Sequence, residues 1–196
     1  MRHITIFLLL ILVGCKNETK DRNQIGHESQ SEISPETENG IDQSVSEMWN
    51  NFIQSNPEFK NNEIPESDFF HTNETDANRL AELTLTGKKR ASSGLYSLYL
   101  QYNAELPNVG TKQIVTDFNG KAKAIIETMS VDTIPFNKIS KKYAQLDMGT
   151  SIEPLKKWKK AHWDFFESFL KERGQKPTEE MLIVAVEFKK IWPKNE

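Results

Sequence analysis

The chain has 196 residues, of which 37% are hydrophobic and 27% are charged, and its formal net charge is −3. This length suits one folded domain with a hydrophobic core, and the near-neutral charge excludes a protein that holds nucleic acid through a uniformly basic surface. The single cysteine, Cys15, excludes a framework of disulfides within the chain.

An export signal is indicated at the start of the sequence. Arg2 precedes an apolar run from Ile4 to Val13, which is too short to span a bilayer comfortably and has the layout of a secretory signal. Leu12-Val13-Gly14-Cys15 resembles the lipobox of bacterial lipoproteins, whose cysteine is acylated after cleavage. We therefore expect a signal peptide over 1–14 and an exported lipoprotein, anchored in a membrane of the bacterial cell envelope through acylated Cys15. A plain signal peptide followed by an incidental cysteine is the alternative.

The next segment is polar. It is rich in Glu, Asn, Ser, Gln and Thr, and its large apolar residues are Ile25, Ile33 and Ile41. Such a composition cannot bury enough surface to offset its chain entropy. We expect a lipidated disordered tether over 15–43 and a folded domain over 44–196. Residues 1–43 hold four Lys or Arg and seven Asp or Glu, which leaves 21 of each sign in the domain.

Three helices are predicted in the first part of the domain. Ser44 to Glu47 has the spacing of a capping box, and apolar residues then recur at helical intervals until Pro57. Asp76 is placed to cap a second helix, which Gly87 ends. A third helix would carry Leu95, Leu98, Tyr99 and Tyr102 and end by Pro107.

The apolar period then changes from about 3.6 to about two, which indicates strands. Ile114 to Phe118 and Lys123 to Val131 flank Asn119-Gly120, a pair typical of a type I′ hairpin turn. A short helix over Ser140–Met148 is expected to end at Gly149. The capping-box spacing of Thr150 to Glu153, followed by Pro154, predicts a long helix that ends at Gly174.

Met181 to Ile191 reads as a buried final strand. Strands that are interrupted by helices, with one hairpin and this last strand, predict an α+β fold. We expect a small β-barrel or curled mixed sheet surrounded by helices.

Three cations follow a predicted helix end at Lys88, Lys89 and Arg90. They could simply compensate the negative end of the helix dipole. Ser92 follows Arg90 after one intervening residue, at the expected start of a new helix, and a helix N-terminus beside cations favours anions. Ser92 would either cap that helix or act as a nucleophile, with Lys89 as its base.

Asp147 is placed against local preference, because the last turn of a helix disfavours a negative charge. It could pair with Lys89 across a cleft, or with Lys141 or Lys142. The mature chain offers His27, His71 and His162 without paired spacing, so we expect no metal and no cofactor. His162 is expected to be a packed, hydrogen-bonded core residue.

Several segments in order resemble the ASCH domain family. These are Gly87 to Ser92, Val115 to Gly120, Pro135-Phe136, Trp158 to Phe166 and Leu182 to Phe188. The resemblance implies a PUA-like β-barrel with a cleft beside the Gly-Lys motif, in a family associated with RNA or nucleotide binding. One branch of the family removes the acetyl group of N4-acetylcytidine with a lysine, a hydroxyl residue three positions later and an acid.

Carried over to this chain, those catalytic residues are Lys89, Ser92 and Asp147. Serine and aspartate stand where threonine and glutamate are expected, and Gly110-Thr111 replaces an expected Gly-Asp. The first hypothesis is a binding cleft for a nucleoside, a nucleotide or an RNA-related anion. Five further residues are predicted to line it: Gly87, Lys88, Arg90, Asp117 and Trp163. The alternatives are an amidohydrolase that deacylates N4-acetylcytidine-type substrates, and an interaction module without enzymatic activity.

Overall fold

The computed structural model describes residues 41–194. The predicted signal peptide, the lipidation site Cys15 and all but the last three residues of the predicted tether lie outside the described residues. Between residues 41 and 194, no helix combines the length and the apolar character that a bilayer crossing requires.

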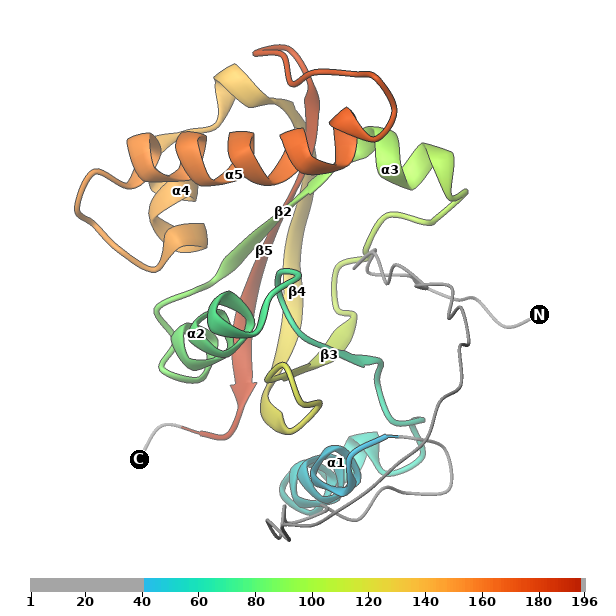
Figure 1. The fold of residues 1–196 in the computed structure, drawn as a ribbon. Helices are drawn as coiled ribbons and strands as arrows, with labels where there is room; N and C mark the ends of the chain where they lie inside the picture. Colours follow the sequence, from blue (N-terminus) through green and yellow to red (C-terminus); the bar gives the residue numbers. More distant parts are fainter. Residues whose placement is uncertain (1–40, 195–196) are drawn as a thin grey trace, which may run out of the picture.

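A five-stranded sheet forms the centre of the described part of the chain, in the order β1-β3-β4-β5-β2 (Figure 1). Its strands are β1 (Ser67–Asp68), β2 (Ala91–Leu95), β3 (Lys112–Thr116), β4 (Ala122–Pro135) and β5 (Leu182–Trp192). The short β1 runs parallel to β3, and the other neighbours pair antiparallel. Register shifts interrupt the β3–β4 and β4–β5 ladders, and such bulges bend and twist a strand.

The helices surround this sheet, so the predicted α+β class is confirmed. They are α1 (Gln43–Ser55), α2 (Glu74–Leu85), α3 (Tyr96–Gln101), α4 (Lys141–Met148) and α5 (Pro154–Lys171), with 3-10 turns at Pro57–Phe59 and Phe136–Lys138. In Figure 1, α5 crosses one end of the sheet beside α4, α1 lies at the opposite end, and α2 lies between them.

Two of the hydrophobic clusters explain this arrangement. Trp158 and Phe166 of α5 are almost fully buried against Phe136 and Ile183. At the other end, the predicted apolar face of the first helix packs its Trp49 against β3 and β4. Each large side chain buried in this way stabilises the fold by about 1.5–3 kcal/mol, so the sheet is held at both ends.

The helix starts differ from the predicted capping boxes. The Asp42 side chain caps α1 by accepting from Ser44 N, and the Ser44 hydroxyl instead accepts from Ala122 N of β4. Asn73, not Asp76, caps α2. Glu153 adopts a left-handed φ of 48° and makes no side-chain cap, so α5 begins on Pro154. The first capping-box prediction was wrong because the Asp42 carboxylate reaches the free backbone group at the start of α1. The second was wrong because α5 begins later, at Pro154, without a side-chain cap.

The prediction of a helix starting at Ser92 is also wrong. Residues Ala91–Leu95 form the edge strand β2, in which Ser92 pairs with Val186 of β5, and α3 begins at Tyr96. A Cβ atom at Gly94 would approach the ring of Tyr99 to 3.0 Å, so a larger residue at this position of β2 would force that ring to shift. The apolar spacing that begins at Leu95 predicts a helix, but hydrogen bonding of Ala91–Leu95 to the distant β5 makes this segment a strand.

The predicted hairpin is present between β3 and β4, but its turn is not type I′. Asp117 N donates to Lys121 O, and the turn places Gly120 at φ 83° while Asn119 keeps a negative φ. This is a three-residue loop with a left-handed glycine in the last position. The Asp117 carboxylate accepts from Asn119 N and Lys121 N, which stabilises the loop from within.

Candidate functional site

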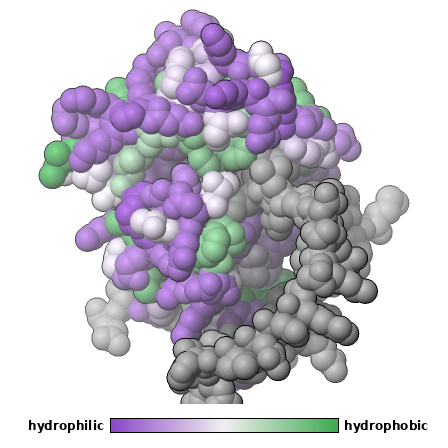
Figure 2. All heavy atoms as spheres, in the orientation of Figure 1, coloured by the Kyte–Doolittle hydropathy of each residue, from purple (hydrophilic) through white to green (hydrophobic). Residues whose placement is uncertain are grey.

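A cavity of about 520 Å³ opens between α2 and α5. Its walls carry the aromatic side chains of Phe70, Tyr99, Phe165 and Phe169, and its floor includes Lys89. Figure 2 shows a band of apolar residues directly below α5, between it and the lobe that carries α2. A volume of this size accommodates a small organic molecule.

The backbone after α2 turns Lys89 into the interior. Gly87 takes a left-handed φ of 69°, and the amides of Lys88 and Lys89 both donate to Leu83 O. Arg90 N then donates to Leu146 O of α4. As a result Lys89 is 4% exposed, while the neighbouring Lys88 and Arg90 side chains are exposed to solvent.

Lys89 meets Asp147 at the end of α4. Its Nζ donates to Asp147 Oδ1 at 2.5 Å and to the backbone oxygen of the same residue at 3.1 Å. Ser140 caps the start of α4 and a left-handed Gly149 ends it, which fixes Asp147 in the last turn. The side chain of Asp147 is 2% exposed, so the predicted pairing with Lys89 exists as a buried ion pair.

The second carboxylate oxygen of Asp147 is surrounded by donors from β2 and α5. Ser93 Oγ donates to Oδ2 at 2.6 Å and Trp158 Nε1 donates at 2.8 Å. His162 Nε2 lies 3.3 Å from the same oxygen. Tyr143 OH lies 3.1 Å from Ser93 Oγ and donates to Ser92 O. The carboxylate is thus held from several elements at once.

These neighbours decide the charge of Asp147. Burial alone would raise the pKa of its carboxyl group, but the nearby charges of Lys89 and His162, together with their hydrogen bonds, hold that pKa well below its usual range. The opposite effect acts on Tyr143, whose pKa is raised well above 10 by burial and by the Asp147 charge. The site therefore keeps a carboxylate ionised in a dry environment.

The three residues predicted as catalytic, Lys89, Ser92 and Asp147, all line this cavity. Successive side chains of a strand point to opposite faces. In β2, Ser93 is the hydroxyl that contacts Asp147, while Ser92 lies on the other face with its strand partner Val186. The catalytic roles of these residues stay predictions.

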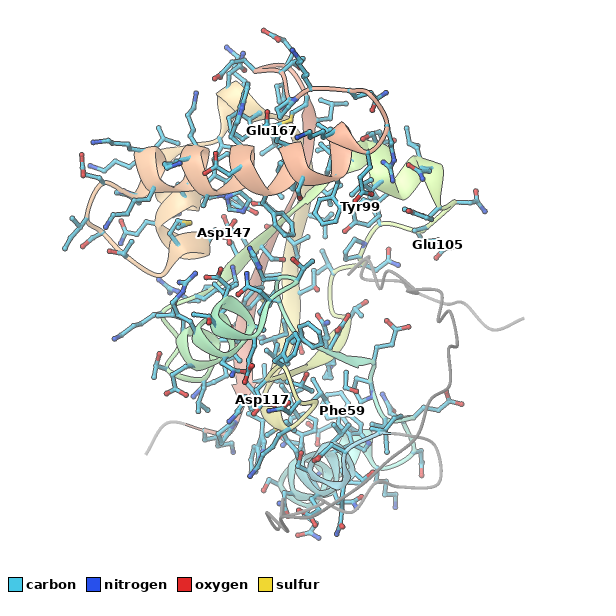
Figure 3. All side chains as sticks on the ribbon, in the orientation of Figure 1. Phe59, Tyr99, Glu105, Asp117, Asp147 and Glu167 are labelled. Atoms are coloured by element: carbon cyan, nitrogen blue, oxygen red, sulfur yellow. The ribbon has the colours of Figure 1, made fainter. Side chains whose placement is uncertain are left out.

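The other five residues that were predicted to contact the ligand do not line the cavity. These are Gly87, Lys88, Arg90, Asp117 and Trp163. Asp117 lies at the β3–β4 hairpin, away from Asp147 (Figure 3), where it pairs with Lys123 at 3.2 Å. Trp163 packs edge-on against Phe136 instead. For Asp117 and Trp163 the structure thus supplies partners outside the cavity.

Sequence reasoning missed Ser93, Trp158 and His71 as parts of the site and assigned His162 to the core alone. His162 does stack on Trp158, with a centroid distance of 4.3 Å, but it also lines the cavity. His71 lines the cavity with a left-handed φ of 74°, a conformation that is uncommon outside glycine and is often found at functional sites. The helical spacing of apolar residues predicts which side of α5 carries His162. It does not show that Asp147 and the cavity lie opposite this side chain.

A model of the ASCH domain family matches residues 66–192. The chain belongs to the ASCH domain family. A solved ASCH domain from Lactobacillus crispatus JV V101 is 33% identical to it with a TM-score of 0.69, covering 77% of this chain and 96% of its own length. Protein EF3133 from Enterococcus faecalis V583 is 27% identical with a TM-score of 0.67, covering 76% of this chain and 88% of its own. No curated protein matches the chain.

Membership of the ASCH family confirms the resemblance and the PUA-like fold that it implied. The matched residues 66–192 contain Lys89, Asp147 and His162, and they leave out α1. The cavity therefore belongs to the ASCH domain itself. Residues 41–194 contain no group of three or more His, Cys, Asp or Glu side chains placed to hold a metal ion.

Proposed function

We propose that this ASCH domain binds a nucleobase-containing molecule, a nucleoside or a nucleotide, in the cavity between α2 and α5. The observation that carries the proposal is the buried Lys89–Asp147 pair beneath aromatic walls. Burying two charges costs free energy that a well-packed apolar pair would not cost. Charges kept in a dry cavity are typical of a binding or catalytic site.

The walls suit a planar ring. Phe165 and Phe169 meet edge to face at 4.9 Å, and Phe70 lies on the same cavity. Aromatic side chains stack on nucleobases, and each stacked base contributes about 1–3 kcal/mol to binding. The cavity volume of about 520 Å³ admits one base with its sugar and excludes a duplex. An RNA ligand would therefore bind through one base turned out of its strand.

The floor supplies the polar contacts. An ammonium group has three N–H donors, and two hydrogen bonds of Lys89 go to Asp147, which leaves one donor for a ligand. Ser92, on the opposite face of β2 from Ser93, also lines the cavity, and its hydroxyl can both donate and accept. Together these groups match the mixed donor and acceptor edge of a nucleobase.

Binding is favoured over hydrolysis by the state of Asp147. Its pKa is held well below the usual range, so its carboxylate is a weak base for activating a hydroxyl. Ser93 Oγ donates to Asp147, and Lys89 Nζ donates to the same residue. An amidohydrolase that uses Lys89 as base would need the ligand to break this pair first.

Calorimetric titration of the full chain with nucleosides, nucleoside monophosphates and N4-acetylcytidine tests the proposal. We expect micromolar to millimolar binding of at least one compound, and a loss of about tenfold or more in Lys89→Ala, because removing a buried hydrogen-bond partner costs about 1–3 kcal/mol. Lys88→Ala is the matched control, since Lys88 is exposed and does not line the cavity.

Equal affinity in the wild-type chain and in a folded Lys89→Ala variant would contradict this site. Acetate release from N4-acetylcytidine that disappears in Lys89→Ala would instead establish the amidohydrolase. Absence of both binding and turnover across the set would favour the interaction module.

We also propose that the domain is tethered to a membrane through acylated Cys15. The lipobox-like Leu12 to Cys15 and the polar residues that follow support this proposal. In cells that express the full chain we expect wild-type protein in the membrane fraction and Cys15→Ala protein outside it, because several acyl chains are needed for stable anchoring. An unchanged membrane fraction of the variant would overturn the tether.

A further inference from the structure

Both ring nitrogens of His162 face oxygen atoms that accept hydrogen bonds. Nδ1 lies 3.0 Å from the backbone oxygen of Trp158, and Nε2 lies 3.3 Å from Asp147 Oδ2. A carbonyl oxygen and an ionised carboxylate carry no proton to give, and a neutral imidazole has only one N–H. Only the doubly protonated ring, which is a cation, donates in both directions.

A charged His162 changes the balance at the cavity floor. Lys89 and His162 then carry two positive charges around the single negative charge of Asp147. The side chain of His162 is 15% exposed and those of the other two are 4% or less, so solvent screens these charges weakly. With His162 in this charged form, the floor would carry one net positive charge.

The remaining ionisable groups around His162 do not cancel this charge. Asp164 of α5 pairs with Lys160 at 2.7 Å, and Asp76 of α2 pairs with Arg79 at 2.8 Å. His71, from the segment before α2, lies on the same cavity, and burial lowers its pKa, which favours the neutral ring. Tyr143 of α4 stays neutral because burial raises its pKa.

We propose that protonated His162 and Lys89 together form an anion-selective floor, so that the cavity prefers ligands with a phosphate or carboxylate group and binds them less tightly as pH rises. This rests on the proposed function, because it names the ligand class of that cavity. Lys89 offers the direct N–H contact. His162 acts through charge, since its two ring nitrogens lie beside Trp158 O and Asp147 Oδ2.

The protonation state is testable without any ligand. Nitrogen-15 NMR of the histidine rings in the full chain, with His162→Gln used to assign the signal, distinguishes the imidazolium from the two neutral tautomers. At pH 6 we expect both ring nitrogens of His162 to be protonated. A single-proton tautomer at pH 6 overturns the proposal, whatever the cavity binds.

Selectivity is tested by titrating the full chain with a nucleoside, its 5′-monophosphate and inorganic phosphate between pH 6 and pH 8.5. We expect the monophosphate to bind about tenfold more tightly than the nucleoside at pH 6, and this preference to shrink as pH rises. A phosphate gains negative charge above pH 6, so its own titration would strengthen binding and cannot produce this trend.

His162→Gln, which keeps a donor but no charge, is expected to remove the preference and its pH dependence. Lys88→Gln is the matched control, because Lys88 is an exposed cation that does not line the cavity, and it should retain the pH dependence. A preference that survives in folded His162→Gln contradicts the proposal. If neither nucleoside nor monophosphate binds, the proposed function fails, and phosphate binding that depends on His162 would still support the anion-selective floor.

Discussion

Two aspartates, one in β1 and one in α4, are removed from water with opposite results. Asp68 is half-buried beside β3, accepts a hydrogen bond from Phe69 N and has Glu66 as a neighbour; this partial burial raises its pKa to about 6. Asp147 is more deeply buried, and its pKa is lowered because Lys89 and other donors surround it.

The difference shows that burial alone does not mark a functional carboxylate in this fold. Near the edge strand β1, an aspartate without a cation partner is pushed toward its neutral form. At the cavity floor, groups from β2, α4 and α5 converge and keep the charge. Long-range convergence of donors is what keeps the buried carboxylate of Asp147 charged at the cavity floor.

The largest expected effect on stability comes from removing the Asp147 carboxylate at the cavity floor. Asp147→Ala leaves the Lys89 ammonium buried without its carboxylate, and we expect a loss of about 3–5 kcal/mol in the free energy of unfolding at pH 7. Denaturant unfolding measures this loss. A loss of less than about 1 kcal/mol in the free energy of unfolding would show that Asp147, like Asp68, contributes little to stability.

A double variant separates stability from binding. In Lys89→Met/Asp147→Asn both charges are removed, and the amide oxygen of asparagine can still accept a hydrogen bond from Ser93 or Trp158. The stability should therefore return toward that of the wild type while ligand binding stays lost.

The stability loss of Asp147→Ala has a pH dependence of defined sign. Because the folded-state pKa of Asp147 is lowered, its contribution is complete above about pH 4 and is lost as pH falls further, so the deficit of Asp147→Ala should shrink in acid.

A smaller effect of opposite sign is expected at β1. With its folded-state pKa raised to about 6, Asp68 destabilises the fold once it is forced to ionise, so Asp68→Asn should stabilise the protein by about 1 kcal/mol above pH 6. The gain should vanish below about pH 4, where both states hold the proton. Asp132→Asn on the exposed part of β4 is the control, with an expected change within about 0.5 kcal/mol. A gain that does not vary with pH would contradict this account.

Strong periodic patterns predicted most of the elements. The apolar face of α1, the β3–β4 hairpin, α4 and the final strand were all recognisable because their signals lie within about ten residues of each other. The strand β2 was missed, since Ala91–Leu95 becomes a strand only through pairing with β5, about ninety residues further along. Local spacing carries no information about that partner.

Only part of the site could be predicted, because the sequence shows local preferences and not long-range partners. Asp147 could be singled out because a negative charge at a helix end is locally unfavourable, and the family resemblance gave Lys89 as its partner. Lys88 and Arg90 share the charge of Lys89, and only the backbone turn onto Leu83 O shows which cation is buried. Asp117 has the same side chain as Asp147, yet its partners lie within its own hairpin.

The position of β2 at the sheet edge has a consequence for biosynthesis. Its sheet partner is β5, the last strand among the described residues, so Ser93 cannot be fixed against Asp147 until nearly all of residues 41–194 have left the ribosome. Contacts between such distant segments form slowly. A nascent ASCH domain that still lacks β5 would therefore be without its charged cavity floor throughout synthesis, and the floor would assemble as one of the final events of maturation.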